Sequence, residues 1–468
     1  TGGNNSSFGY GALRNNTTGG SNSAFGFLAL NANTTASQNT AFGMQALDAN
    51  TTGSSNTAVG TNALGQNTTG TRNTAVGLAC LSYNTTGQSN TAMGNEALPD
   101  NTTGTDNTAL GDKAMFENTS GDRNTGLGRE ALHLNTTADN NTAVGYYALR
   151  SNTTGGSNTA VGKGALDANT TANGNTAVGD TALGANTTGG ENTATGFAAL
   201  GNNTTASNNT AFGYYALLAN TTGAGNTGLG KAALSNVTTG TNSVGVGYNA
   251  GSSQTTAGHN TIMGRNSMGA NTTGSNNVSI GSFCMDVGSG MNYNVAIGHD
   301  TARSVTTGSN NVMIGHAAGH SNSPSGTITT GSNSVVLGNN STQNIYCADT
   351  SISNSDKRDK TDITDFTHGL NWVNQLKPVT YRWDRRSWYS DDLSATPDGS
   401  KKRNKKHIGF LAQDVLAVEG NPTDKDDMLV VNLNEDNTSY GVKYERLVPV
   451  LVNAIKELST KVTALEAK

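Results

Sequence analysis

A glycine recurs every 17 residues from Gly9 to Gly315, and it does so 19 times without a change of register. Strict repetition with a period near 20 residues is typical of solenoids, in which each repeat forms one coil and packs on its neighbours. Each repeat reads as a short Asn-Thr-Ala-Val strand, a turn at the glycine, an Ala-Leu step and a polar Asn-Thr-Thr-Gly turn. The period therefore predicts a β-solenoid or β-roll shaft whose coils pair in parallel about 4.8 Å apart.

Asparagine occupies the same places in almost every repeat, as at Asn16, Asn33 and Asn50. Glycine and asparagine both tolerate the left-handed backbone that tight corners require. Asparagines at one position of every coil would also stack on one another, and stacked side-chain amides form hydrogen-bonded ladders in other in-register sheets. We therefore expect Asn ladders along the shaft.

The composition changes abruptly near residue 355. Residues 355–468 hold 18 of the 28 Lys and Arg, 18 of the 33 Asp and Glu, and all three tryptophans. A formal net charge of -5 gives no reason to expect nucleic acid as a partner, and the basic run Lys401–Lys406 is balanced by nearby acids. No apolar run approaches the roughly 20 residues of a membrane span, so no membrane insertion is expected.

These changes predict three parts of the chain. A short insertion near Ser321–Gly326 also breaks the repeat register before Gly338. The expected parts are a shaft over 1–340 (regular to about 246 and degenerate over 247–340), a neck over 341–354, and a separate domain over 355–468 that ends in a helix over about 444–468.

The predicted shaft has a thin apolar core. Each repeat offers only about four apolar side chains, and two of them are often alanine. Small cores rarely compensate for the entropy that a chain loses on folding. Packing of three chains around a common axis would remove this weakness, so we expect a homotrimer.

Comparison between repeats indicates that the cysteine and histidine side chains of the shaft have structural roles. Cys80 and Cys284 stand where other repeats have alanine, which predicts small buried side chains. His299 and His316 lie one period apart with His320 nearby, but other repeats place Tyr, Lys, Asp or Arg after the glycine. We therefore expect an exposed face there, with no metal site, and no cofactor anywhere in the chain.

The repeats resemble the head repeats of trimeric autotransporter adhesins and, more closely, the Asn-Thr-Ala-Val-Gly-Tyr-x-Ala-Leu repeats of phage tail-fibre-like proteins. The C-terminal part resembles a second family, the intramolecular chaperone domains of endosialidases and phage tail fibres. Four blocks in order carry that resemblance, namely Ser355–Ile363, Leu376–Trp383, His407–Val415 and Tyr444–Leu458. The third block departs from the hallmark of the family in one residue, because Asp414 replaces the usual Glu.

This resemblance implies an α+β domain that assists assembly of the trimeric shaft and then cuts itself off between Asn354 and Ser355. By the same resemblance, Ser355 is the nucleophile and Lys360 is the general base of a Ser-Lys peptidase that acts once. Asp356 and Arg358 are expected to support this site. His407 either assists proton transfer or has a structural role.

A heptad pattern closes the chain. Apolar residues step by four and three positions, which is the spacing of a coiled-coil seam. The residues of this expected trimerisation seam are Leu451, Ile455, Leu458, Val462 and Leu465.

The combined features predict a virion tail fibre or spike that attaches to a host-surface glycan or protein receptor, and to other tail proteins through a segment that precedes Thr1. A bacterial surface adhesin or extracellular fibre is the alternative. A glycan-degrading tailspike is the less favoured reading, because residues 1–354 contain no tryptophan and no paired-carboxylate constellation.

Overall fold

The computed structural model describes residues 2–342, 360–361, 363–386, 389, 395–433 and 439–467. The chain divides into two compact units, Thr1–Tyr293 and Asn294–Lys468. Each unit is described by itself.

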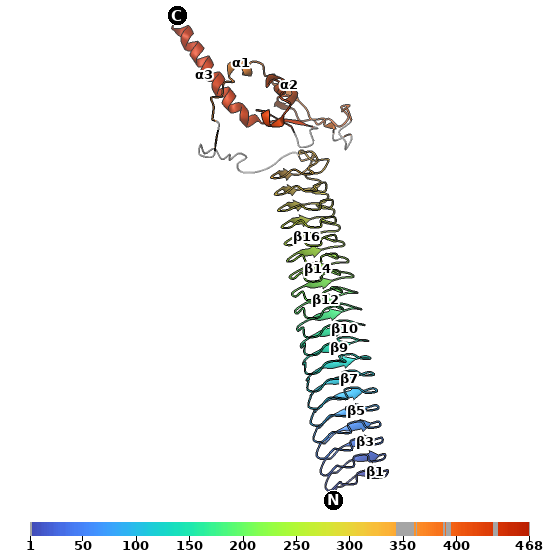
Figure 1. Cartoon of the computed structure of the whole chain (residues 1–468). Coiled ribbons are helices and arrows are strands. Elements are labelled where there is room, and N and C mark those ends of the chain that lie inside the picture. Colours follow the sequence, from blue (N-terminus) through green and yellow to red (C-terminus); the bar gives the residue numbers. More distant parts are fainter. Residues whose placement is uncertain are drawn as a thin grey trace. The chain divides into compact units, whose positions relative to one another are not determined.

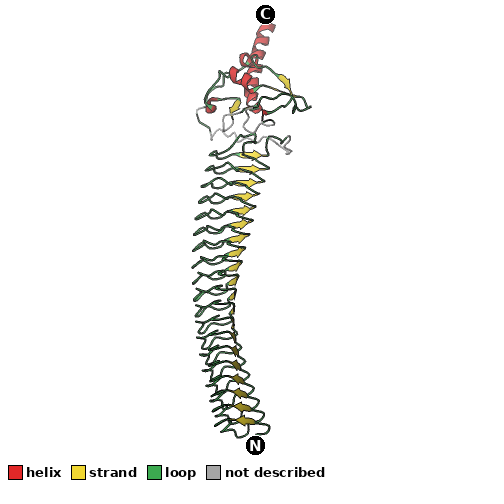
Figure 2. Ribbon diagram, turned by 90° about the vertical axis from the view of Figure 1, so that its right-hand side faces the viewer, coloured by secondary structure: helices red, strands yellow, loops and turns green. Residues whose placement is uncertain are grey.

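The first unit is a parallel β-solenoid in which each 17-residue repeat forms one coil with one three-residue strand (Figure 1). Every strand pairs in parallel with the next, and Thr142 and Val144 lie opposite Thr159 and Val161. Figure 2 shows these strands stacked above one another. The strands are β1 (Ser6–Phe8), β2 (Ser23–Phe25), β3 (Thr40–Phe42), β4 (Thr57–Val59), β5 (Thr74–Val76), β6 (Thr91–Met93), β7 (Thr108–Leu110), β8 (Thr125–Leu127), β9 (Thr142–Val144), β10 (Thr159–Val161), β11 (Thr176–Val178), β12 (Thr193–Thr195), β13 (Thr210–Phe212), β14 (Thr227–Leu229), β15 (Val244–Val246), β16 (Thr261–Met263) and β17 (Val278–Ile280).

The second unit begins with three more coils of the same kind. Their strands are β18 (Val295–Ile297), β19 (Val312–Ile314) and β20 (Val335–Leu337). Val312 pairs with Val335, which is 23 positions further along the chain instead of 17. The six extra residues correspond to the insertion predicted near Ser321–Gly326.

The interior of each coil combines small apolar side chains with asparagine. In the ninth coil Ala143, Ala148 and Leu149 are fully buried, and so are Asn141 and Asn152. The Asn152 side chain donates to the side-chain oxygen of the equivalent Asn135 at 2.9 Å and to the backbone oxygen of Gly155 at 2.9 Å. The predicted Asn ladders are therefore confirmed, and they satisfy polar groups that burial would otherwise leave without partners.

The left-handed conformation at the corners of the coils extends beyond the glycine and asparagine residues that were expected to suit it. The periodic Gly145 has φ 136°, but the buried Leu149 has φ 53° and Tyr147 has φ 60°. Leucine normally avoids this region of the backbone map. Here the buried leucine side chain and the coil-to-coil hydrogen bond from its N–H to the Ala165 oxygen, 2.9 Å long, hold the strained backbone in place.

The strands place one row of mostly apolar side chains, half-buried in some coils and exposed in others, on the outside of the solenoid. In β2–β17 the middle residue of each strand is buried and the third residue points outward. In β1–β17 that third residue is apolar in every strand except β12, where it is Thr195. We call this set the outward row, and it includes Phe42, Phe212 and Leu229 with exposed fractions of 58%, 54% and 45%.

The remainder of the second unit is a small α+β domain. Its elements are α1 (Leu370–Val373), β21 (Val379–Tyr381), β22 (His407–Gly409), α2 (Ala412–Val418), the short 3-10 helices η3 (Lys425–Asp427) and η4 (Tyr444–Arg446), β23 (Val431–Leu433), β24 (Tyr440–Val442) and α3 (Leu447–Glu466). The pairs β21–β22 and β23–β24 are antiparallel. The core consists of Trp372, Val415, Met428, Val430, Val431, Leu447 and Val450.

The predicted fold class is thus confirmed as a parallel β-solenoid followed by an α+β region with a C-terminal helix. None of the helices in the described ranges is long and apolar enough to cross a membrane. Cys80 and Cys284 are buried as predicted, and burial raises the pKa of the Cys80 thiol to about 12 and that of the Cys284 thiol to about 11. Such thiols are poor nucleophiles at neutral pH.

Candidate functional site

The predicted cleavage site lies largely outside the described residues. This holds for Asn354, Ser355, Asp356 and Arg358. Lys360 is described, and its side chain is exposed. The proposed pairing of Ser355 with Lys360 therefore stays a prediction.

His407 is half-buried on β22, directly opposite Tyr381 of β21. The two rings stack with their centroids 5.6 Å apart, and the Trp383 and His407 rings meet edge-to-face with their centroids 6.3 Å apart. Burial raises the pKa of Tyr381, and the negative charge of an ionised Tyr444 adds to this rise. His407 is thus packed within an aromatic cluster, and its predicted part in proton transfer stays a prediction.

Steric crowding explains why residue 409, in the third sequence block, is a glycine. Gly409 ends β22 beside the Tyr444 hydroxyl, and a Cβ atom at this position would overlap that oxygen. The same hydroxyl accepts a hydrogen bond from the backbone N–H of Phe410 at 3.0 Å. The third and fourth blocks therefore meet at the Tyr444 hydroxyl, and glycine at 409 leaves room for it.

One carboxylate, that of Glu419, binds the backbone of the segment that leads into β23. Glu419 accepts hydrogen bonds from the backbone N–H groups of Leu429, Val430 and Val431 at 3.2, 2.6 and 3.0 Å. Hydrogen bonds to a charged acceptor are stronger than those between neutral groups. Glu419 thereby fixes the start of β23 against α2.

The closing helix α3 has two distinct faces. Leu447, Val450 and Ala454 are buried against the domain. Asn453 and Glu457 fasten the same helix to α1 and to the segment before it. Asn453 donates to the Phe366 oxygen at 2.6 Å, and Glu457 accepts from the N–H of Leu370, the first residue of α1, at 3.0 Å.

The predicted seam lies beside these buried residues and continues toward the C-terminal end of α3, and all five seam side chains are between 43% and 69% exposed. Five exposed apolar residues at a/d spacing are suited to packing against other helices.

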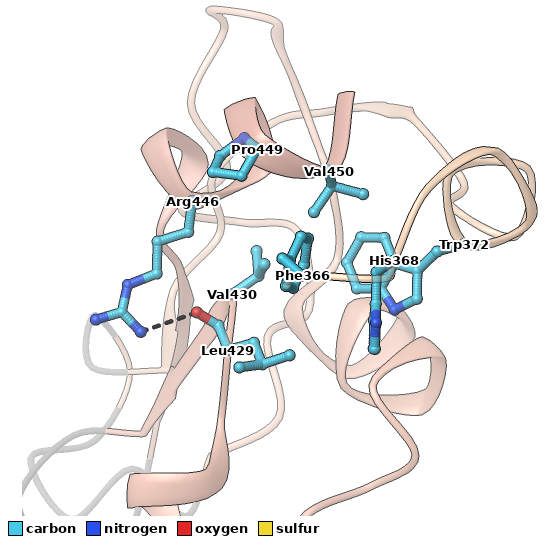
Figure 3. A pocket seen from close by; sticks show the side chains of 8 residues that line it. All are labelled: Phe366, His368, Trp372, Leu429, Val430, Arg446, Pro449 and Val450. Carbon is cyan, nitrogen blue, oxygen red and sulfur yellow. Dashed lines mark hydrogen bonds between the residues drawn. The ribbon is translucent and has the colours of Figure 1, made fainter. Parts of the chain in front are cut away.

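The domain also contains a pocket of about 350 Å³ beside the start of α3 (Figure 3). It is lined by Phe366, His368, Trp372, Leu429, Val430, Arg446, Pro449 and Val450. Arg446 donates to the Leu429 oxygen at 2.9 Å. The buried indole N–H of Trp372 has no hydrogen-bond acceptor among the described residues.

Sequence reasoning missed this pocket, because its lining comes from three separate segments of the chain. The only signal in the sequence was a tryptophan placed among polar residues at Asn371 and Asn374.

Residues 355–423 match the protein family described as the chaperone of endosialidase. The predicted resemblance to this chaperone is confirmed over those residues. The match covers β21, β22 and α2, and it ends before β23 and α3. Neither a curated protein nor a solved structure matches the chain at a significant level.

Proposed function

We propose that the chain is the shaft of a homotrimeric fibre or spike that attaches to a host surface, and that its C-terminal domain guides assembly before releasing itself. The observation that carries this proposal is the match of residues 355–423 to the chaperone of endosialidase, directly after a parallel β-solenoid. Parallel pairing between distant segments is slow and prone to trapping. A domain that aligns three chains at one end would remove that difficulty.

Two exposed apolar surfaces support the trimer. The outward row repeats at each coil of the first unit, and the α3 seam repeats along the closing helix. Soluble monomers rarely expose contiguous apolar surfaces of this extent. Burial of a leucine, valine or phenylalanine side chain contributes roughly 1.5–3 kcal/mol. Three chains packed through both surfaces would gain part of this contribution at each coil whose outward residue is apolar, which is every coil of the first unit except that of β12.

The position after each periodic glycine supports the attachment function. Phe197 and Tyr214 stack at 5.3 Å between ring centroids, and Lys231 lies between the rings of Tyr214 and Tyr248 at 5.5 and 5.8 Å. These aromatic side chains are exposed on a rigid scaffold. Exposed aromatic rings provide large contact areas at a low entropic cost, which suits a receptor-binding face.

The proposed cleavage consumes one water molecule. The Ser355 hydroxyl oxygen attacks the carbonyl carbon of Asn354 while the Lys360 amine takes the hydroxyl proton and delivers it to the departing nitrogen. Water then hydrolyses the resulting ester. The products are an Asn354 carboxylate and a chain that begins with the free amino group of Ser355.

Intact-mass measurement tests this chemistry. Wild type is expected to yield one fragment that ends at Asn354 and one that begins at Ser355. Ser355→Ala should stay whole, and so should Lys360→Arg, because arginine keeps the charge but cannot act as a base at neutral pH.

Ser353→Ala is the matched control and should be cut like wild type. Cleavage of Ser355→Ala at the same bond would disprove the role of Ser355. A wild-type chain that stays whole after assembly would leave only the chaperone part of the proposal.

A further inference from the structure

Two histidines stand side by side on consecutive coils of the second unit. His299 and His316 each follow the periodic glycine of their coil, so the register places them at equivalent positions. Their rings stack with centroids 5.5 Å apart and an angle of 14° between planes. Both side chains are exposed. The coil spacing thus brings together two imidazoles that are distant in the sequence.

A carboxylate completes the group. The Asp300 Oδ2 atom lies 3.1 Å from the His299 Nδ1 atom. One donor atom from each of His299, Asp300 and His316 can be chosen so that all three lie within 4.8 Å of one another. Ligands about 2.0–2.1 Å from a tetrahedral zinc ion are about 3.3 Å apart. Small rotations of exposed side chains are sufficient to close that difference.

We propose that His299, Asp300 and His316 form a binding site for a divalent transition-metal ion of the zinc class. Two imidazoles and one carboxylate are a ligand set that such ions favour, and three protein ligands leave one position open for water. The comparison between repeats led us to expect no metal site, because it considered the position after the glycine over all coils together. Histidine occurs there only in two consecutive coils, and metal binding depends on that adjacency.

Two neighbouring side chains modulate the site. The Arg303 Nη1 atom lies 3.1 Å from the Asp300 Oδ1 atom and competes with a cation for that carboxylate. The Asn339 side-chain amide lies 3.2 Å from the His316 Nδ1 atom and orients that ring. Removal of the Arg303 charge should therefore favour metal binding, whereas loss of either histidine should weaken it.

Titration of the full chain with zinc chloride, followed by calorimetry, tests the site. We expect one saturable ion per chain. His299→Ser and His316→Ser should each weaken binding by at least tenfold, on the order of the loss caused by changes around metal ligands. Serine is chosen because Ser282 occupies the equivalent position one coil earlier. Arg303→Gln should tighten binding severalfold.

His259→Asn is the matched control. His259 is also exposed, and Asn242 and Asn276 occupy the equivalent positions in the adjacent coils. This variant should bind zinc as wild type does, and far-ultraviolet circular dichroism should show that all variants keep the fold. The proposal is overturned if wild type shows no saturable binding, or if both histidine-to-serine variants bind zinc with unchanged affinity.

Discussion

The double substitution Ile455→Lys with Leu458→Lys is expected to prevent the chain from forming trimers. The two seam side chains are 66% and 50% exposed, so neither is buried in the domain core. In a trimer the double substitution would replace six apolar contacts with six positive charges, and like charges in such a seam repel one another. Analytical ultracentrifugation of the freshly made protein measures the result.

The matched control places the same charges on another face of the same helix. Ser459→Lys with Thr460→Lys should still give trimers, because both residues are exposed and lie outside the seam. The core residues Leu447, Val450 and Ala454 are unchanged in both variants, so the domain should fold in each. Trimers of the Ile455 and Leu458 variant in wild-type yield would show that α3 does not align the chains.

Replacement of Gly145 by alanine is expected to cause a large loss of shaft stability, although it adds only one methyl group. Gly145 has φ 136°, and its new Cβ atom would lie 2.5 Å from the Gly162 oxygen and 2.7 Å from the Gly162 carbonyl carbon. The backbone strain alone costs about 1–3 kcal/mol. The overlap with the backbone of the next coil adds to it, so we expect a total loss of more than about 4 kcal/mol.

Gly164→Ala separates the strain from the overlap. Gly164 has φ 62°, but the nearest atom to its added Cβ is the Thr181 methyl group at 3.7 Å. Tyr147 and Thr181 already occupy the equivalent positions of the neighbouring coils. This variant should lower the free energy of unfolding by less than about 1 kcal/mol. Similar melting of the two variants in thermal denaturation would contradict the proposed overlap between coils.

The repeat allowed the shaft to be predicted in detail. A fixed period sets the coil length, and identical residues at identical positions must stack, which is why the ladder through Asn135 and Asn152 could be foreseen. The left-handed conformation of Leu149 could not be foreseen, because local preference opposes it. Burial of the side chain and hydrogen bonds between coils outweigh that preference, and neither is visible in one repeat considered alone.

The C-terminal domain was less accessible to sequence reasoning. The blocks around Gly409 and Tyr444 were recognised separately, but only the folded chain shows that one hydroxyl joins them. The pocket beside Trp372 and the carboxylate of Glu419 depend on contacts between distant segments. The C-terminal domain has no periodic sequence pattern from which contacts between distant segments could be predicted. The same limit applies to His299 and His316, whose value as ligands comes from their adjacency across coils.

Residues 355–468 should be needed to assemble the shaft, because the proposed function assigns the alignment of three chains to them. The direct test is the molar mass, measured by light scattering, of protein produced with and without those residues. The full chain, 47.8 kDa per copy, should give shafts with the mass of three copies, whether or not the C-terminal domain has been released. A chain that ends at Asn354 should give monomers or aggregates. If that shorter chain forms the same trimers in the same yield, the domain is not an assembly chaperone for this shaft.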